Sequence, residues 1–293
     1  MAKTILITGA DGFTGPYVEK AFSEFGYNTV PLVIAKSEER QVEVDLCDYK
    51  AVESMVLDLK PDGIIHLAGI SFVGHGNTED FYKVNVIAVT NILDALINTG
   101  SNYCKVVLAS SANIYGNPNT DRSISEDTLP SPVNHYANSK LSMEFMVRNY
   151  FDKLPIVITR PFNYIGPGQN ENFLVPKMVK HFKEKQDSIE LGNIDVSRDF
   201  TDVRDVAQCY LELFNSSAVS EVVNLCSGNV YKLKEILSFL SELTGHEIDI
   251  KVNPQFIRTN EIKTLYGNNQ KLFELTGFRP QIDIKDTLES MLG

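Results

Sequence analysis

Residues 4–15 read Thr4-Ile5-Leu6-Ile7-Thr8-Gly9-Ala10-Asp11-Gly12-Phe13-Thr14-Gly15 and constrain the architecture more than any other segment. The first five residues have the β-branched character of a buried strand, and apolar residues recur at helical spacing from Pro16 to Phe25. The glycines between them form a G-x-x-G-x-x-G turn. Such a turn lets the backbone approach a pyrophosphate, which the N-terminus of the helix then binds. We therefore expect a dinucleotide site here; a tight turn that binds no ligand is the alternative.

Strands and helices alternate along the first half of the chain. Further strands are expected at residues 29–34, 41–44, 63–68, 105–109 and 155–159. The helices expected between them span residues 49–59, 81–98 and 138–151. Continuous apolar strands separated by helices form parallel sheets that are covered on both faces. The sequence therefore predicts an α/β fold, a Rossmann-type doubly wound parallel sheet with a smaller C-terminal lobe.

The pattern changes after Arg160, where prolines, glycines, Asn and Gln form a long polar loop. Shorter elements without regular alternation follow, apart from a helix expected at residues 201–214 and a strand expected at residues 221–225. The predicted division is residues 1–163 plus 202–228 for a dinucleotide-binding domain, and residues 164–201 plus 229–293 for the smaller lobe.

The composition of the 293-residue chain excludes several classes of protein. No apolar run approaches the ~20 residues of a membrane-spanning helix, and the N-terminal segment lacks the pattern of a signal peptide. The 27 Lys and Arg against 38 Asp and Glu give a net charge of -11, which repels a phosphate backbone. The cysteines and histidines are scattered without metal-ligand spacing. We expect a cytoplasmic protein that has no metal site and binds neither nucleic acid nor membrane.

The ends of the second and third expected strands bear on which dinucleotide is bound. An NAD site usually has an acidic residue about 20 residues beyond the glycines, where it binds the ribose 2′-hydroxyl. Ala35 occupies that region, and Lys36, Ser37 and Arg40 follow with groups that can donate to a 2′-phosphate. NADP is therefore favoured over NAD, although an exposed loop of mixed charge explains the segment equally well and NAD stays open. Asp45-Leu46 could contact the adenine ring, or begin a helix instead.

The segment Tyr136-Ala137-Asn138-Ser139-Lys140 places a phenol and an ammonium on one face of an expected helix. A tyrosine with a pKa near 10 is a poor acid–base catalyst at neutral pH, and a fixed cation beside it lowers that pKa. Such pairs also occur by chance on helix surfaces. Here Ser110-Ser111 follows the strand at residues 105–109, at the sheet edge where α/β proteins bind ligands. A hydroxyl there can hydrogen-bond the same substrate oxygen as the phenol.

These motifs resemble those of the extended short-chain dehydrogenase/reductase family, in its nucleotide-sugar branch. The resemblance covers nearly the whole chain and rests on the glycine-rich turn, His66-Leu67-Ala68-Gly69, Asn85, Ser110-Ser111 with Tyr115-Gly116, the Tyr136 and Lys140 pair, and Arg160-Pro161-Phe162-Asn163. It implies that Ser111, Tyr136 and Lys140 are catalytic and that the C-terminal lobe binds a sugar nucleotide. Asn85 would support the active site.

The resemblance also implies the residues that would bind each ligand. The expected cofactor-binding residues are Gly9, Asp11, Gly12, Phe13, Thr14, Gly15, Lys36, Ser37, Arg40, Asp45, Leu46, Leu67, Ala68, Gly69, Asn85, Tyr136, Lys140 and Pro161. The expected substrate-binding residues are Ser111, Asn113, Asn163, Val175, Lys177, Arg198, Arg258 and Glu261.

Asn113 distinguishes between the activities of this branch. Its sugar dehydratases carry an acid two residues after the catalytic Ser or Thr, because elimination of water needs a second proton donor and acceptor. An amide cannot exchange that proton, which leaves reduction of a ketone or 4-epimerisation. Four segments resemble the reductases that act on GDP-4-keto-6-deoxy-D-mannose: residues 160–169, 198–205, 224–228 and 258–267. Thr259 and Asn260 depart from the Arg-Pro-Ser/Thr-Glu-Val of GDP-sugar enzymes, so dTDP- and CDP-linked sugars stay open.

The resemblance thus implies an NADPH-dependent reductase whose partner molecule is a nucleotide-linked 4-keto-6-deoxyhexose. One alternative is a nucleotide-sugar 4-epimerase with tightly bound NAD. Another is a non-catalytic dinucleotide sensor on the same fold. The helices expected at residues 81–98 and 138–151 resemble those of the family's dimer interface, so a homodimer is expected unless they only cover the sheet.

Overall fold

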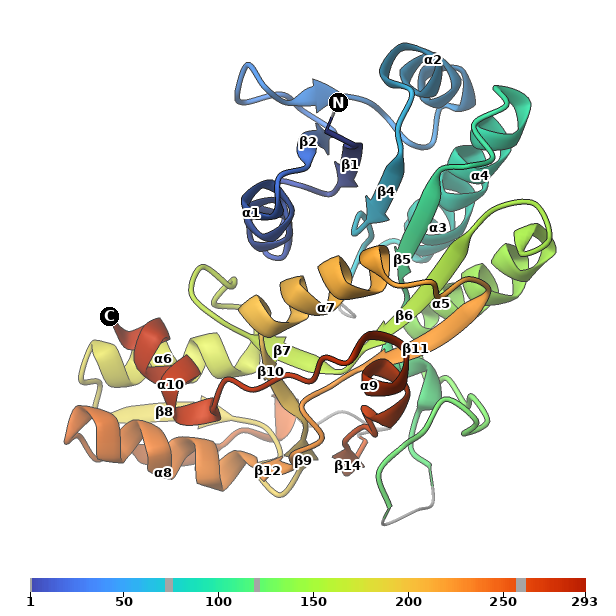
Figure 1. The fold of residues 1–293 in the computed structure, drawn as a ribbon. Coiled ribbons are helices and arrows are strands. Elements are labelled where there is room, and N and C mark those ends of the chain that lie inside the picture. Colours follow the sequence, from blue (N-terminus) through green and yellow to red (C-terminus); the bar gives the residue numbers. More distant parts are fainter. Residues whose placement is uncertain (1, 72–75, 119–121, 257–261) are drawn as a thin grey trace.

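The computed structural model describes residues 2–71, 76–118, 122–256 and 262–293. Its centre is a seven-stranded sheet in the order β11-β6-β5-β4-β1-β2-β3, and every pairing in it is parallel (Figure 1). The strands are β1 (Thr4–Thr8), β2 (Asn28–Val33), β3 (Val42–Glu43), β4 (Gly63–His66), β5 (Lys105–Ala109), β6 (Ile156–Pro161) and β11 (Glu221–Leu225). The strand order reverses between β1 and β4, and ligands of such sheets bind beyond the carboxyl ends of the strands at this point.

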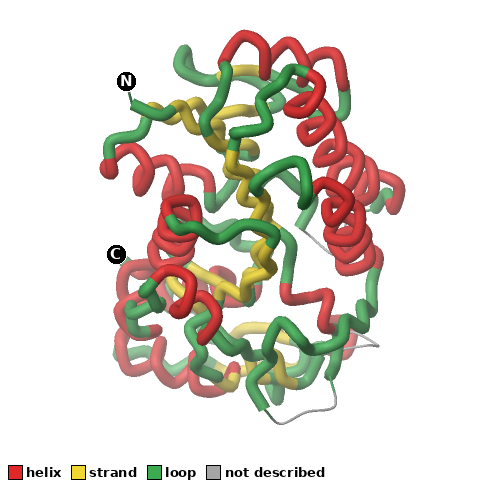
Figure 2. Tube along the Cα trace, turned by 45° about the vertical axis from the view of Figure 1, so that its right-hand side comes forward, coloured by secondary structure: helices red, strands yellow, loops and turns green. Residues whose placement is uncertain are grey.

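Helices cover both faces of the sheet (Figure 2). One face packs against α1 (Gly15–Phe25), α7 (Val203–Asn215) and α9 (Gln270–Thr276). The other packs against α2 (Tyr49–Leu59), α4 (Ala88–Asn98) and α5 (His135–Val147). The strands contribute alternate side chains to the two layers; Ile5 and Ile7 face α1 and α7, whereas Leu6 faces the other layer. The predicted Rossmann-type architecture is confirmed.

The helix predicted at residues 81–98 is interrupted. It consists of α3 (Thr78–Tyr82), a π-helical turn η1 (Lys83–Ile87) and α4. The buried Asn85 lies in the π-helical turn, and its side-chain amide bonds the loop after β4 and helix α5. Turns of this kind are frequent at functional sites. Tertiary hydrogen bonding of one residue therefore overrides the helical periodicity here.

The helix predicted at residues 138–151 starts earlier and ends earlier. The Asn134 side chain accepts a hydrogen bond from the Ala137 N–H and so caps α5. Beyond Val147 the chain tightens into the 3-10 turn η3 (Arg148–Tyr150). Because α5 begins at His135, Tyr136 lies in its first turn and shares a helical face with Lys140.

The C-terminal half builds a second apolar core. It is formed by α6 (Leu174–Lys183), β8 (Ser188–Leu191), α8 (Leu233–Thr244) and α10 (Ile284–Leu292), and β13 (Asp249–Val252) pairs with β8. The remaining short elements are η2 (Ala112–Tyr115), β7 (Asn163–Ile165), β9 (Ser197–Arg198), β10 (Phe200–Asp202), β12 (Tyr231–Lys232), η4 (Pro254–Phe256) and β14 (Thr264–Leu265). Within the described ranges, no helix combines the length and apolarity that a membrane crossing requires.

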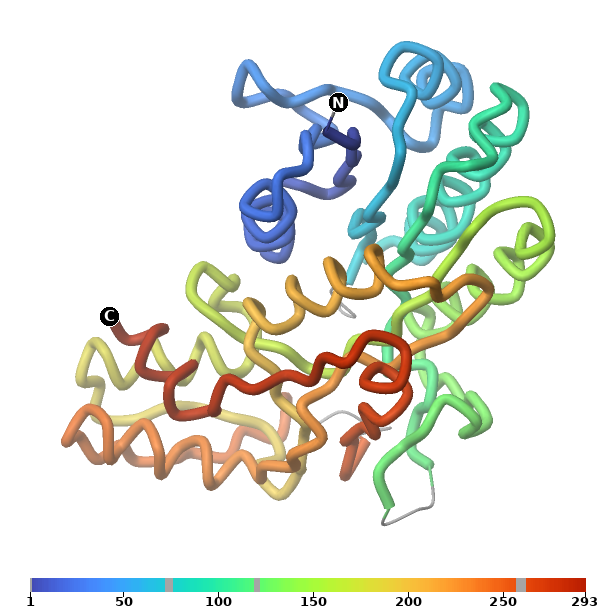
Figure 3. The backbone as a smooth tube through the Cα atoms, in the orientation of Figure 1, coloured from blue at the N-terminus to red at the C-terminus, as the bar shows by residue number. Residues whose placement is uncertain are grey.

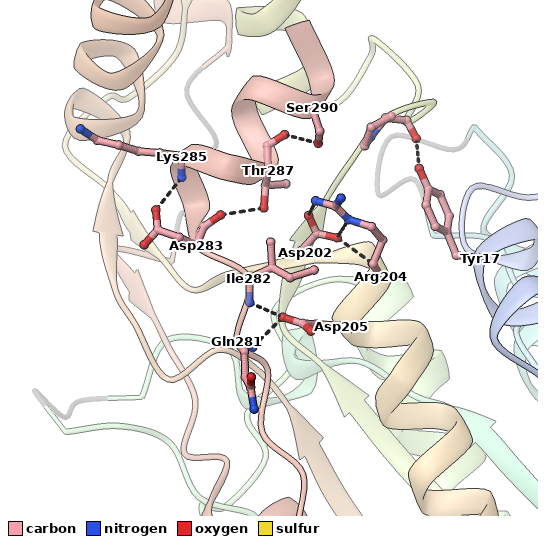
Figure 4. Close-up of polar contacts among 11 residues, drawn as sticks. Tyr17, Asp202, Arg204, Asp205, Gln281, Ile282, Asp283, Lys285, Thr287 and Ser290 are labelled. Atoms are coloured by element: carbon pink, nitrogen blue, oxygen red, sulfur yellow. Dashed lines mark hydrogen bonds and ion pairs between the residues drawn. The ribbon is translucent and has the colours of Figure 1, made fainter. Parts of the chain in front are cut away.

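The chain returns to the sheet near its C-terminus (Figure 3). Leu272 of α9 belongs to the apolar layer under α7, although the sequence assigns this segment to the lobe. The following residues run along α7, where Asp205 accepts hydrogen bonds from the Gln281 and Ile282 N–H groups at 2.7 and 2.8 Å (Figure 4). The division into two domains at the expected boundaries stays a prediction.

Candidate active site

A cleft runs along the carboxyl ends of β1 and β4, where the strand order reverses. It consists of two cavities of about 380 and 360 Å³ that share Gly9, Gly12, Leu67 and Gly69 in their walls. The larger cavity extends over the ends of β5 and β6, and the smaller one extends over the ends of β2 and β3. This shape fits an elongated ligand that crosses the glycine-rich turn.

The shape of the glycine-rich turn depends on the missing side chains of its three glycines. Gly9 has a φ of +63°, and a Cβ there would lie 2.8 Å from the backbone of Ala68. A Cβ on Gly15 would lie 2.2 Å from the Ala10 carbonyl oxygen, so only glycine lets α1 start this close to the turn. Gly12 lines both cavities. The backbone thus forms the cradle that a dinucleotide pyrophosphate requires.

The smaller cavity contains several of the expected cofactor-binding residues. Asp11, Ala68, Asp45 and Leu46 line it, together with Ile34 at the end of β2. Asp45 does not cap a helix, because the N-cap of α2 is Asp48, which accepts from the Lys50 N–H. Asp45 and Leu46 thus line a cavity, and their contact with an adenine ring stays a prediction.

The expected 2′-phosphate donors lie outside both cavity walls. Arg40 forms ion pairs with Glu19 and Glu38. The Ser37 hydroxyl donates to the Gln41 side chain at 3.1 Å, and the Lys36 N–H donates to Glu43. The loop thus has the mixed-charge character of the alternative interpretation, and its contact with a 2′-phosphate stays a prediction.

Ser111, Tyr136 and Lys140 are buried and together line the larger cavity. The Ser111 oxygen accepts hydrogen bonds from the backbone N–H and the side-chain amide of Asn113, both at 3.2 Å. With its acceptor positions used, the Ser111 hydroxyl is oriented to donate. The Lys140 ammonium donates to the Ala109 carbonyl at 2.8 Å, at the end of β5.

Burial shifts the pKa values of both ionisable groups of this trio. It raises the pKa of Tyr136 to about 12, although the hydrogen bond with Ser111 acts in the opposite direction. It lowers the pKa of Lys140 to about 8, against the attraction of Glu144. The expectation that the ammonium lowers the pKa of the phenol is not met, because desolvation dominates and the ammonium bonds the Ala109 carbonyl. At neutral pH Tyr136 is a protonated acid.

Asn85 lies beside this site rather than in the cavity wall. Its amide accepts from the Ile70 N–H at 3.0 Å and donates to the Ser139 hydroxyl at 3.0 Å. The Ser139 hydroxyl in turn donates to the Tyr136 carbonyl. Asn85 therefore links the loop after β4 to the first turn of α5.

The expected substrate-binding residues divide into three groups. Asn113 and Asn163 line the larger cavity with Ser111. Val175 is buried in the core of the lobe, Lys177 donates to the Glu190 carbonyl, and Arg198 lies on β9 with its guanidinium on the Ser197 carbonyl, so none of them lines the cavity. Arg258 and Glu261 lie outside the described residues.

The structure adds residues to the site that the motifs did not indicate. Tyr164 lines the larger cavity, stacks on Phe13 with ring centroids 5.9 Å apart and bonds the Thr14 hydroxyl at 2.9 Å. Gln169 also lines it, and its side-chain oxygen is buried without a hydrogen-bond partner among the described residues. Both lie in the polar segment after β6, where no periodicity marks individual positions.

Comparison with known proteins agrees with this geometry. A family model described as GDP-mannose 4,6 dehydratase matches residues 6–291. The chain belongs to this family. The resemblance to the nucleotide-sugar branch of the extended short-chain dehydrogenases/reductases is thereby confirmed, and the family is one of oxidoreductases.

Two curated relatives and one solved structure are especially informative. GDP-6-deoxy-D-talose 4-dehydrogenase of Aggregatibacter actinomycetemcomitans is 38% identical over 279 residues, covering 93% of this chain and 91% of that protein. GDP-6-deoxy-D-mannose reductase of Pseudomonas aeruginosa is 30% identical over 307 residues, covering 100% of this chain and 97% of that protein. The structure of RMD from Pseudomonas aeruginosa complexed with NADPH aligns with a TM-score of 0.87 at 29% identity, covering 99% of this chain and 98% of that chain.

Proposed function

We propose that this protein uses NADPH to reduce the C4 ketone of a GDP-linked 4-keto-6-deoxyhexose, giving a GDP-6-deoxyhexose. The observation that carries the proposal is the grouping of Tyr136, Ser111 and Lys140 in one cavity, which continues to the glycine-rich turn. Both curated relatives are named for redox chemistry on GDP-linked 6-deoxy sugars, and the solved relative is complexed with NADPH.

Ser111, Tyr136 and Lys140 each have a separate role in the proposed reduction. When bound, the nicotinamide supplies the hydride that the carbonyl carbon accepts. Ser111 donates a hydrogen bond to the carbonyl oxygen, and Tyr136 releases its proton to the same oxygen as negative charge develops there. Lys140 supplies a buried positive charge on the same face of α5 as Tyr136, and its hydrogen bond to the Ala109 carbonyl fixes the position of that charge. A positioned proton donor of this kind contributes about 10²- to 10⁴-fold to the rate.

Asn113 supports reduction rather than dehydration, the activity in the family's name. Its amide donates to Ser111 and carries no proton that it could exchange with the sugar. Elimination of water would need a second acid at this place. We therefore assign Asn113 the tasks of orienting Ser111 and contacting the substrate.

We further propose that the protein is a homodimer through α4 and α5. Ile87, just before α4, is 49% exposed, and Phe145 of α5 is 57% exposed, on helices that pack side by side. Apolar side chains of this size are favourable contacts for a second copy of the same face.

We also propose a division of the binding functions between two domains. Residues 1–163 plus 202–228 bind the dinucleotide, and the rest of the chain binds the sugar nucleotide.

The test is a substrate panel with purified protein and NADPH. GDP-, dTDP- and CDP-linked 4-keto-6-deoxyhexoses are supplied separately, oxidation of NADPH is followed by absorbance, and the product is identified by NMR. We expect turnover with the GDP-linked sugar and its abolition by Tyr136→Phe; the C4 configuration of the product distinguishes a 6-deoxytalose from a 6-deoxymannose. Interconversion of C4 epimers by protein-bound NAD without added reductant would contradict the proposal.

A further inference from the structure

A buried ion pair lies directly behind the catalytic trio. The Arg160 guanidinium and the Glu144 carboxylate are 2.7 Å apart, and their side chains are 3% and 1% exposed. The Arg160 Nε donates to the same carboxylate at 3.0 Å, and the Ser110 hydroxyl donates to it at 2.5 Å. Glu144 thus receives hydrogen bonds from β6 and from the residue after β5.

Arg160 extends this network to a fourth element. Its Nη1 donates to the Tyr115 hydroxyl at 2.8 Å and to the Glu126 carbonyl at 3.1 Å. The Tyr115 hydroxyl donates to the Asn224 side chain of β11 at 2.7 Å. The network therefore ties β5, β6, β11 and α5 together beneath the cavity.

Three members of the network adjoin residues of the site, and one of them, Ser110, itself lines the larger cavity. Ser110 precedes Ser111, Arg160 precedes Pro161 of the cavity wall, and Glu144 lies one helical turn beyond Lys140. Removing two charges from water costs several kcal/mol per ion, and well-packed apolar residues are often as stable as a buried ion pair. Stability alone therefore does not explain the ion pair between Arg160 and Glu144, and we look for its role in the fixed geometry and the charge that it provides beside the site.

We propose that Glu144 is a positioning residue. Through its bonds to Ser110 and Arg160 and its place on α5, it fixes where Ser111 and Lys140 lie relative to each other. Its carboxylate also stabilises the positive charge of the Lys140 ammonium. The proposal rests on the proposed function for its kinetic consequence only. Glu144 does not itself line the cavity and reaches it only through Ser110, so it is not a catalytic residue.

The groups that face Lys140 come from three elements. On α5 they are Tyr136 and Glu144, on β5 the Ala109 carbonyl, and on β4 His66. Burial together with the charge of Lys140 lowers the pKa of His66 to about 3, so His66 is neutral at physiological pH. Glu144 is the group that raises the pKa of Lys140 against burial. Without this carboxylate, the ammonium would lose its proton at a lower pH.

The test titrates Lys140 directly. NMR of protein labelled with ¹³Cε-lysine follows the ammonium, and the Lys140→Met variant assigns its signal. We expect the Lys140 pKa to fall by about one unit in Glu144→Gln and to be restored in Glu144→Asp. The matched control is Asp202→Asn, because Asp202 is also buried and also pairs with an arginine, Arg204 at 2.7 Å, but lies at the start of α7 (Figure 4). The control should leave the Lys140 pKa unchanged.

Two further measurements complete the experiment. If Glu144→Gln does not fold, the double variant Glu144→Gln/Arg160→Met removes both charges and leaves neither unpaired. The Lys140 pKa is expected to fall in it too, by less than in the single variant, because loss of the Arg160 charge acts in the opposite direction. In kinetics, the alkaline limb of kcat/KM should move with the Lys140 pKa. A Lys140 pKa equal to the wild-type value in the folded variant would overturn the proposal. Because the titration needs no substrate, a wild type without reductase activity would refute the proposed function and leave this result standing.

Discussion

Burial shifts the pKa values of Tyr136 and Lys140 in opposite directions because it disfavours the charged form of each. For Tyr136 the result is a phenol that keeps its proton until a developing alkoxide takes it. For Lys140 the result is an ammonium that is charged at neutral pH but titrates near pH 8. The working range of the site is therefore set by the lysine rather than by the tyrosine.

This difference predicts the pH dependence of the reaction. Lys140 is protonated below its pKa of about 8 and neutral above it, whereas Tyr136, with a pKa of about 12, keeps its proton throughout this range. We expect kcat/KM to be level below about pH 8 and to fall about tenfold per unit at higher pH. Initial rates of NADPH oxidation from about pH 6 to pH 10 measure this. An alkaline limb near pH 10, the range of an exposed lysine, would contradict the assignment.

A single glycine tests the packing of the turn. A Cβ at position 15 would meet the Ala10 carbonyl oxygen at 2.2 Å, so Gly15→Ala must displace backbone. Alanine in a helix normally gains up to about 1 kcal/mol over glycine, but overpacking costs about 1–3 kcal/mol, and we expect the loss to prevail. Chemical denaturation should show reduced stability, and NADPH affinity should fall. Gly76→Ala is the control, since a Cβ there meets nothing within 4 Å.

Among the elements, α1 does more than present its N-terminus to the cleft. Tyr17 of α1 donates its hydroxyl to the Pro167 carbonyl at 2.7 Å (Figure 4), and Phe13 and Thr14 contact Tyr164 of β7. These contacts join the glycine-rich turn to the loop of residues 166–170, which carries Gln169 into the larger cavity. These contacts therefore connect the proposed cofactor side of the cleft to its proposed substrate side.

Removal of one oxygen atom, that of the Tyr17 hydroxyl, should weaken this connection. Tyr17→Phe removes the hydrogen bond to Pro167 and leaves the aromatic contact with Phe13. We expect the KM for the sugar nucleotide to rise about fivefold, the equivalent of about 1 kcal/mol, with little change in NADPH affinity. Tyr27→Phe is the matched control, because Tyr27 bonds Asn215 beyond the other end of α1. Equal KM values for Tyr17→Phe and the wild type would refute the link.

Elements whose formation depends on local sequence could be predicted, and features that depend on tertiary contacts could not. Strands β1, β5 and β11 lie where their β-branched runs predicted them, because buried parallel strands carry a strong local signal. The π-helical turn at Asn85 had no such signal, since it depends on bonds to Ile70 and Ser139. The ion pairs of Arg40 with Glu19 and Glu38 also had no local sequence signal, because they depend on how the loop folds against α1.

The same distinction holds for the site. Motifs indicated Ser111, Tyr136 and Lys140 because each occupies a regular position at a strand end or on one helix face. Glu144 follows the same helical spacing and could have been found by continuing it by one turn. The burial of Val175 in the core of the lobe could not be predicted, because it depends on packing between α6 and α8, which local pattern does not encode.

For the whole molecule, the exposed apolar side chains of Ile87, just before α4, and of Phe145 on α5 are the basis of the expected assembly. Phe145→Lys places a charge on the proposed contact face without entering the core, since this side chain is 57% exposed. We expect a change from dimer to monomer in sedimentation velocity, with the circular dichroism spectrum unchanged. Phe25→Lys, at a 59% exposed phenylalanine on α1, is the control and should stay dimeric. A wild type that sediments as a monomer would contradict the proposed interface.

The most direct test of the central claim follows the hydride itself. NADPH carrying deuterium at both hydrogen positions of C4 of the dihydronicotinamide is incubated with the protein and GDP-4-keto-6-deoxymannose, and the product is analysed by NMR. The account predicts one deuterium at C4 of the resulting GDP-6-deoxyhexose, formed by the wild type and not by Tyr136→Phe. A product without deuterium at C4, or a deuterated product formed at the wild-type rate by Tyr136→Phe, would contradict it.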